Sequence, residues 1–506
     1  MVRYVGGLIV LFLVLSSGFA QQPGDDSSNP AESVEDRLAR LEEQNASLLR
    51  MIETLEQKQQ EQAKSGQSSS SSSGSKSGSG GSSEALTFKV TWRDQLYFQT
   101  SDRAFRLHVG GRFHFDFAWF TAEDQVETGP GGVGPLEDAV NFRRARLRME
   151  GTIYEQINFV SEYDFTNQRD DRGNFLGSGI FDNYIEIAQL PIIGHFRAGH
   201  FREPFSYDAL VSGNDLMFLE RSLLQDAFVP FRNMGMMVWD SVLEDRITWW
   251  AGWFFANASN VNATEAQDGN YAGTVRLGWC PYYEDDGCRA IHLGAAYSYR
   301  KTIADPAGGL DFTLFAARPE CRVVTPLFAN TGRIASPRYQ LFGAEFAAVW
   351  HRFQVQSEYM AALVDDAIWP YVGGVPRGDA FFQGFYVQAS CFLTGECRPY
   401  NLVEKRPSRL KPVENFFVWG NEETAWALPK HCGWGAWEIA CRYSHLDLIN
   451  SGIRGGILDD VTLGLNWYLN PNTKVQWNYI LVLRDAPNPA SSGTAQIFTM
   501  RFAIDW

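Results

Sequence analysis

The chain has 506 residues, a formal net charge of −15 and 20% charged residues. A chain this acidic is a poor partner for nucleic acid, so no nucleic acid is expected to bind. Its seven cysteines fit an exported protein, but no histidine accompanies them at the spacing of a zinc site. We therefore predict neither a metal nor a cofactor.

The first 20 residues have the pattern of a secretory signal peptide. Arg3 supplies a positive charge, and the 11 residues from Val5 to Leu15 are apolar. A membrane-spanning helix needs about 20 apolar residues, so this stretch is too short. No other stretch in the sequence is long enough, so a membrane location would require a closed β-barrel.

A heptad pattern follows the signal peptide over residues 31–64. Leu38, Asn45 and Ile52 occupy a positions, and Leu41, Leu48 and Leu55 occupy d positions. Because no adjoining domain is predicted for this helix to pack against, we expect a self-associating coiled coil, with Asn45 fixing its register. Residues 65–83 are nearly all Ser and Gly and form a flexible linker.

From residue 84 to residue 506 the chain is predicted to be all-β. In sixteen segments apolar residues alternate with polar ones, as in β-strands. A barrel with both chain ends on one side requires an even number of strands. The segments are 105–119, 141–151, 153–165, 180–189, 195–202, 233–242, 246–257, 269–280, 289–300, 338–349, 352–364, 381–393, 434–446, 460–469, 474–485 and 496–506.

The connections between these segments sort into two sets. Those of one set are mostly tight turns, with the long segment 394–433 as an exception, whereas the other set contains long loops, among them 166–179, 365–380 and 447–459. Outer-membrane barrels have short periplasmic turns and longer external loops. The last segment alternates up to a terminal Trp506, as such proteins typically do. We predict a 16-stranded antiparallel transmembrane barrel.

One face of the first two strands is rich in arginine. Alternation puts the side chains of Phe113 and Leu147 toward lipid and the arginines toward the lumen. The candidates for the permeation path are Arg106, Arg112, Arg144, Arg146 and Arg148. Such a ladder would attract anions. The alternative, left open here, is that it is neutralised by Asp116, Glu150, Glu162 and Asp164.

Several motifs resemble the phosphate-selective porin O/P family of outer-membrane channels. They are NFRRARLRMEG (Asn141–Gly151), EYDF (Glu162–Phe165), RAGHFREPFS (Arg197–Ser206), FLERS (Phe218–Ser222), LTGECRPY (Leu393–Tyr400), GAWEIACRYSHLDL (Gly435–Leu448) and VTLGLNWYLNPNTKVQWNYI (Val461–Ile480). The resemblance implies a homotrimeric porin in the outer membrane of a Gram-negative-type envelope. It would contact lipid, carry small solutes and hold its coiled coil in the periplasm.

The connection 203–232, after the fifth strand, is where such porins fold a loop inward. Its candidate constriction residues are Asp208, Asp215, Glu220 and Arg221, and residues 206–219 contain no Lys or Arg. Phosphate preference is therefore a hypothesis. The alternative is a general, sugar- or cation-preferring porin that tethers the outer membrane to the cell wall through its coiled coil.

Two pairs of cysteines flank short segments. Cys280 with Cys288, and Cys391 with Cys397, are predicted to close turns, whereas the pairing of the other cysteines stays open. An enzyme is not expected, because no G-x-S-x-G or H-E-x-x-H motif is present.

Overall fold

The structure is a computed structural model that describes residues 87–92, 95–169, 175–255, 271–302, 309–323, 325–416 and 433–506. The predicted signal peptide, coiled coil and linker lie outside the described residues. Among the described residues, no helix is long and apolar enough to cross a membrane.

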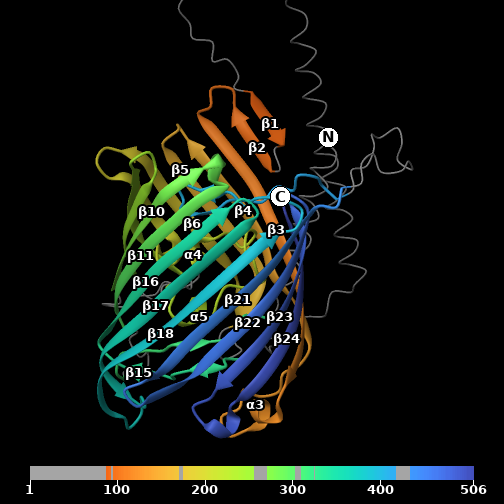
Figure 1. The fold of residues 1–506 in the computed structure, drawn as a ribbon. Helices are drawn as coiled ribbons and strands as arrows, with labels where there is room; N and C mark the ends of the chain where they lie inside the picture. The colour runs from red at the N-terminus through yellow and green to blue at the C-terminus, as the bar shows by residue number, and fades with distance from the viewer. Residues whose placement is uncertain are drawn as a thin grey trace, which may run out of the picture. The chain divides into compact units, whose positions relative to one another are not determined.

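Within the described residues, sixteen antiparallel strands form a closed barrel (Figure 1). Each strand pairs with the next along the chain, and β24 pairs with β3 to close the wall. The strands are β3 (Phe105–Ala122), β4 (Ala139–Ile153), β5 (Ile157–Arg169), β6 (Phe175–Leu190), β7 (Gly194–Arg202), β8 (Arg232–Val242), β9 (Ile247–Phe255), β10 (Tyr271–Glu284), β11 (Arg289–Lys301), β16 (Arg338–Trp350), β17 (Phe353–Trp369), β18 (Val375–Phe392), β21 (Ala436–Asn450), β22 (Ile453–Asn470), β23 (Thr473–Asp485) and β24 (Gly493–Asp505).

The sixteen predicted segments each overlap one of these strands, so the predicted barrel is confirmed. Alternation explains the wall: on β3, Phe113 and Trp119 are exposed on the outside, whereas His114 and Asp116 are buried on the inside. Apolar side chains outside and polar ones inside suit a wall between hydrocarbon and a wet lumen. We call the end that carries Trp506 the short-turn end and the opposite end the long-loop end.

Three predicted long loops are wrong. In the predicted loop 166–179, β5 continues to Arg169 and β6 begins at Phe175. In the predicted loop 365–380, β17 continues to Trp369 and β18 begins at Val375. In place of the predicted loop 447–459, β21 and β22 are joined by a two-residue turn, Ser451 and Gly452. Both turn residues have positive φ, 52° and 78°, as a tight hairpin turn requires.

The strand signal was lost there because the alternation inverts. Near the long-loop end, Asp447 and Asp459 point outward while Leu446 and Leu458 are fully buried inside. Outside the hydrocarbon the outer face meets water, and the inner face packs on apolar loops. Apolar-outward alternation therefore ends before the strands do.

Two loops fold into the barrel and fill part of it. The β7–β8 loop carries α4 (Tyr207–Leu210) and α5 (Leu224–Ala227), and the β11–β16 loop carries β12 (Phe312–Thr313), β13 (Ala316–Ala317), β14 (Ala329–Asn330) and β15 (Ile334–Ala335). Phe205, Phe315 and Phe328 from these loops pack against inward-facing Val364 and Ile480 in one apolar core. The interior is thus packed beside β16–β24, and the open space lies beside β3–β9.

The smaller elements lie in the connections. They are α3 (Asp124–Thr128), η1 (Asp285–Gly287), β19 (Tyr400–Asn401), β20 (Arg406–Pro407) and η3 (Pro489–Ser491).

A hairpin precedes the barrel and was not predicted from the sequence. β1 (Phe88–Trp92) pairs with β2 (Leu96–Thr100), and β2 pairs with the first residues of β3. β24 occupies that edge of β3 only from Arg112 onward. The hairpin therefore continues the wall past the short-turn end (Figure 1).

Candidate permeation pathway

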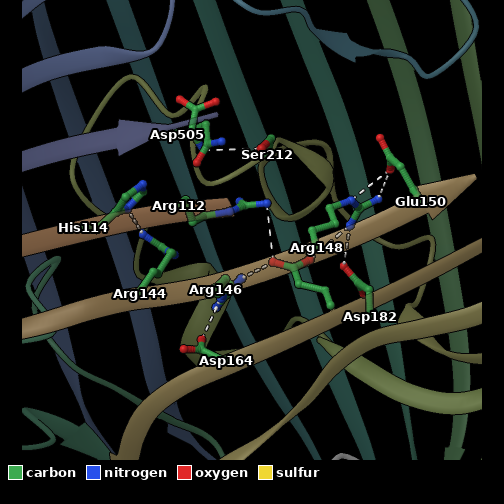
Figure 2. A network of polar contacts seen from close by, with 12 residues as sticks. Arg112, His114, Arg144, Arg146, Arg148, Glu150, Asp164, Asp182, Ser212 and Asp505 are labelled. Carbon is green, nitrogen blue, oxygen red and sulfur yellow. Dashed lines mark hydrogen bonds and ion pairs between the residues drawn. The ribbon is translucent and has the colours of Figure 1, made fainter. Parts of the chain in front are cut away.

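Four of the five candidate arginines point into the barrel together. Arg112 comes from β3, and Arg144, Arg146 and Arg148 come from β4 (Figure 2). Arg106 is exposed and lies apart from them, opposite Thr152 near the start of β3. It lines a different cavity, of about 820 Å³, between the β1–β2 hairpin and the wall.

Carboxylates of β4 and of the neighbouring strand β5 pair with this row of arginines. Arg146 Nε donates to Asp164 at 2.6 Å, and Arg148 contacts Glu150 at 2.7 Å. Glu162 lies within 3.4 Å of both Arg112 and Arg146, so it separates two cations that sit directly opposite each other. Of the two interpretations of the ladder, the contacts favour neutralisation for these three arginines. Asp116 does not take part; it pairs with Arg501 at 2.6 Å.

A bulge in β4 adds an arginine that the parity rule had missed. His114 opposes Arg144 but Phe115 opposes Phe142, so Arg143 is an extra residue in its strand. Phe142 faces lipid and is 60% exposed, whereas the next two residues, Arg143 and Arg144, both face inward. The signal was present in the sequence, because strict alternation would have placed the charge of Arg143 in lipid.

The β7–β8 loop is held across the lumen by hydrogen bonds to several strands. The backbone N–H of Tyr207 donates to Glu358 of β17 at 2.9 Å. Arg442 of β21 donates to the carbonyl of Glu220 at 3.0 Å, and Lys474 of β23 donates to that of Asn214 at 2.8 Å. These contacts reach the strands opposite β7.

The four candidate constriction residues have different surroundings. Glu220 contacts Arg143 at 2.8 Å and Arg501 at 2.8 Å. Arg221 instead donates to the carbonyl of Asp208 at 2.8 Å, so these two neighbours in the chain have different partners. Asp208 accepts from the N–H of Ser222 at 3.2 Å. Asp215 lines the larger cavity described below.

Electrostatics keep the charges of Glu220 and Arg221 in place. Burial raises the pKa of Glu220, but the cations of Arg143, Arg144 and Arg501 outweigh it and hold that pKa well below its usual range. Burial lowers the pKa of Arg221 to about 10, although Asp208 and Glu220 oppose this. Both side chains are therefore ionised at neutral pH.

Two polar cavities lie end to end beside these residues. The cavity at the long-loop end has about 580 Å³ and the one at the short-turn end about 860 Å³. The smaller cavity is lined by seven arginines, Arg143, Arg144, Arg146, Arg202, Arg221, Arg318 and Arg322, and by three carboxylates, Glu220, Asp226 and Glu320. The larger has eight arginines and six carboxylates, so its charges nearly balance.

Arg146 and Arg202 line both cavities and mark the passage between them. The Arg146 guanidinium lies 3.5 Å from the centre of the Phe181 ring, which also stacks with Arg232 at 3.6 Å. Arg202 donates to the carbonyls of Ala209 and Val211. Among the described residues, no carboxylate lies within ion-pair distance of Arg202 or Arg221.

The segment after β18 narrows the short-turn end, and it corrects the disulfide prediction. Cys288 bonds to Cys397, whereas Cys280 and Cys391 are free. The turn prediction failed because β10 extends to Glu284, which leaves Cys280 inside a strand and away from Cys288. The bond fixes the 394–416 segment to the β10–β11 turn.

Two basic residues of this segment, Arg398 and Lys405, are buried. Arg398 contacts Glu438 at 2.7 Å, and Lys405 is fully buried with its ammonium donating to the carbonyls of Asp245 and Leu402. Burial lowers the pKa of Lys405 to about 8. Arg406 and Arg409 line the larger cavity.

The chain matches the model of a known family, "Phosphate-selective porin O and P", over residues 107–506, which is nearly the whole barrel. The chain belongs to this family. It is therefore an outer-membrane porin, and the family's members are channels, in agreement with the expectation that the chain is not an enzyme.

Two relatives and one solved structure are similar to this porin at low sequence identity. Porin O of Pseudomonas aeruginosa is 24% identical over 429 residues, covering 76% of this chain and 85% of that protein. An uncharacterized protein of Caulobacter vibrioides is 24% identical over 422 residues, covering 80% and 74%. An anion-selective porin from Comamonas acidovorans superposes with a TM-score of 0.46 at 10% identity, covering 79% of this chain and 100% of that one.

Proposed function

We propose that this porin preferentially conducts small anions of the phosphate class from the long-loop end to the short-turn end. The observation that carries the proposal is the lining of the smaller cavity, with seven arginines against three carboxylates. A positive field in a water-filled space with low-dielectric walls concentrates anions and excludes cations.

Cations without a direct ion-pair partner give the cavity its sign. Among the described residues, Arg202 and Arg221 hydrogen-bond only to backbone carbonyls, and Asp208 and Glu220 act on Arg221 from beyond ion-pair distance. Both guanidinium groups can therefore attract a permeating anion. Guanidinium groups bind phosphate through two parallel hydrogen bonds, which favours phosphate over halide. The family description, "Phosphate-selective porin O and P", supports the same class of solute.

The paired arginines have a second role in this proposal. Beyond Arg202 an anion meets Arg112, Arg146 and Arg148, each already close to a carboxylate. Such pairs hold an anion weakly, because the carboxylate repels it. An anion that is attracted strongly by the smaller cavity is thus held weakly in the larger one. It can leave the channel from there, and conduction requires that ions leave as well as enter.

Orientation and assembly complete the proposal. Short turns face the periplasm in outer-membrane barrels, so the long-loop end would face outward and the predicted coiled coil would lie in the periplasm. A homotrimer and cell-wall contact through the coiled coil are further proposals that rest on the family resemblance and the heptads.

Reversal potentials in a planar bilayer test the selectivity. Under a gradient of potassium chloride, the reversal potential of the purified protein should have the sign expected of an anion-selective channel. Added phosphate should reduce the chloride current. Arg202→Gln should weaken both effects, whereas Arg352→Gln, in an exposed turn outside both cavities, should not. A cation-selective reversal potential for the unmodified protein would refute the proposal.

A general or sugar-preferring porin is the second candidate. The near balance of charges in the larger cavity supports it, since eight arginines face six carboxylates there. It predicts little selectivity between potassium and chloride and rapid swelling of proteoliposomes in uncharged sugars. Deleting residues 31–64 tests the tethering part: weakened envelopes with normal conductance would support it.

A further inference from the structure

The β1–β2 hairpin has two different faces. Register places Phe88, Val90 and Trp92 on the same side as Leu107 and Val109, which is the lipid-facing side of β3. The other side carries Lys89 and Thr91, which line the 820 Å³ cavity. Phe88, Val90 and Trp92 are 58%, 55% and 61% exposed, although each is large and apolar.

This apolar face cannot be explained by contact with hydrocarbon. In the described residues, β1 pairs with β2 along one edge only, so the N–H and C=O groups of its other edge have no strand partner. Open sheet edges do not occur in the lipid core, because unsatisfied backbone groups are too costly there. β1 therefore lies in water, and within the described part of the chain its three large apolar side chains are each more than half exposed.

The free edge of β1 carries neither a proline nor a bulge, two of the features that keep strands from pairing with other chains. β1 has the sequence FKVTW, without proline, and its register with β2 is regular. Its single charge, on Lys89, faces the cavity rather than the apolar side. Such an edge is a template for another strand, and the exposed side chains beside it would add affinity.

The chain before β1 indicates what the partner is. The heptad segment 31–64 is predicted to bring copies of this chain together, and residues 65–83 connect it to β1. A Ser/Gly linker of this length spans roughly 24 Å, so copies joined upstream would hold their β1 strands near one another at a high effective concentration. A second copy is thus the partner that the chain itself supplies.

We propose that the apolar face and free edge of β1 form a contact between two copies of this porin. The contact would lie outside the membrane, at the short-turn end, and is independent of which ion the channel prefers. It differs from a contact through the barrel wall, because it uses residues that extend beyond the barrel.

Site-specific photocross-linking in cells tests this contact on the full chain. A benzophenone amino acid at Trp92 should link two differently tagged copies and give a species of twice the mass. The matched control is the same substitution at Thr91, on the opposite face of the same strand, which should give at least fivefold less. Equal yields at both positions, adducts to lipid only, or links within one chain only would each overturn the proposal.

A second measurement covers variants that disturb folding. Changing Phe88, Val90 and Trp92 to Thr keeps strand propensity and should leave the single-channel conductance unchanged, because the barrel is untouched. The oligomer should dissociate at a lower temperature in mild detergent. Val372→Thr, at an 85% exposed residue of the β17–β18 turn, is the control. An oligomer as heat-resistant as the unmodified protein would overturn the proposal.

Discussion

Arg146 and Asp164 are hydrogen-bonded at 2.6 Å where the two cavities meet, and both are buried. The pair sets the charge of the passage, because Arg146 lines both cavities and Asp164 cancels much of its field. An anion that enters from the long-loop end therefore first meets arginines without a carboxylate partner among the described residues, such as Arg202. It then meets arginines that are paired with carboxylates, such as Arg146.

Asp164→Asn should make the channel more anion-selective. Without the carboxylate, Glu162 at 3.4 Å is the one ion-pair partner of Arg146 left among the described residues. The loss of a charged hydrogen bond should also lower the free energy of unfolding by about 2 kcal/mol. Bilayer reversal potentials and thermal melting measure the two effects, with Glu244→Gln, in an exposed turn, as the control. Lower anion selectivity in the variant would contradict this account.

Arg202→Gln should reduce anion selectivity more than Arg112→Gln. Among the described residues, Arg202 has no carboxylate within ion-pair distance and hydrogen-bonds to carbonyls, whereas Arg112 already faces Glu162 at 3.4 Å. If Arg202 lowers the energy of an anion in the passage by about 1.4 kcal/mol, its loss changes the anion-to-cation permeability ratio about tenfold. Reversal potentials of the two variants, measured side by side, decide this. Equal effects would mean that pairing does not matter.

Breaking the Cys288–Cys397 bond should loosen the short-turn end. The bond anchors the segment that supplies Arg406 and Arg409 to the larger cavity. Cys288→Ser should therefore raise the open-channel noise and conductance, and lower the free energy of unfolding by about 3 kcal/mol. Cys280→Ser, at a free thiol, is the matched control. The prediction fails if reductant changes neither the noise nor the melting temperature of the unmodified protein.

Acid should destabilise the inward loop through Glu220. Its pKa is held below the ordinary 4.5, so its ionised form contributes stability that is complete above about pH 4.5 and is lost as pH falls through the lowered pKa. Glu220→Gln should cost about 3 kcal/mol at pH 7, because Arg143, Arg144 and Arg501 each lose a carboxylate partner. The difference in melting temperature between the two proteins should shrink below pH 4.5. A constant difference from pH 7 to pH 3 would contradict this origin.

The strand pattern was readable from the sequence wherever both environments were present. On β3, lipid outside and water inside impose a strict alternation, and the same pattern along the chain gives the sixteen strands. Where the strands leave the membrane the alternation inverts, as at Leu446 and Asp447, and the prediction failed. It also failed at Arg143, because a bulge shifts the parity by one residue.

The sequence by itself determined that this chain is a transmembrane barrel with arginines on the inner face, because the two solvents of a barrel wall select residues by parity. Only the tertiary structure decided which charges are compensated. Glu162, Asp164 and Glu220 reach their arginines across strands and from an inward loop, and Cys288 reaches Cys397 across 109 residues. The sequence offered Glu162 and Asp164 as candidates, but these partners lie on other strands or on a loop, so no local pattern specifies which arginine each carboxylate meets.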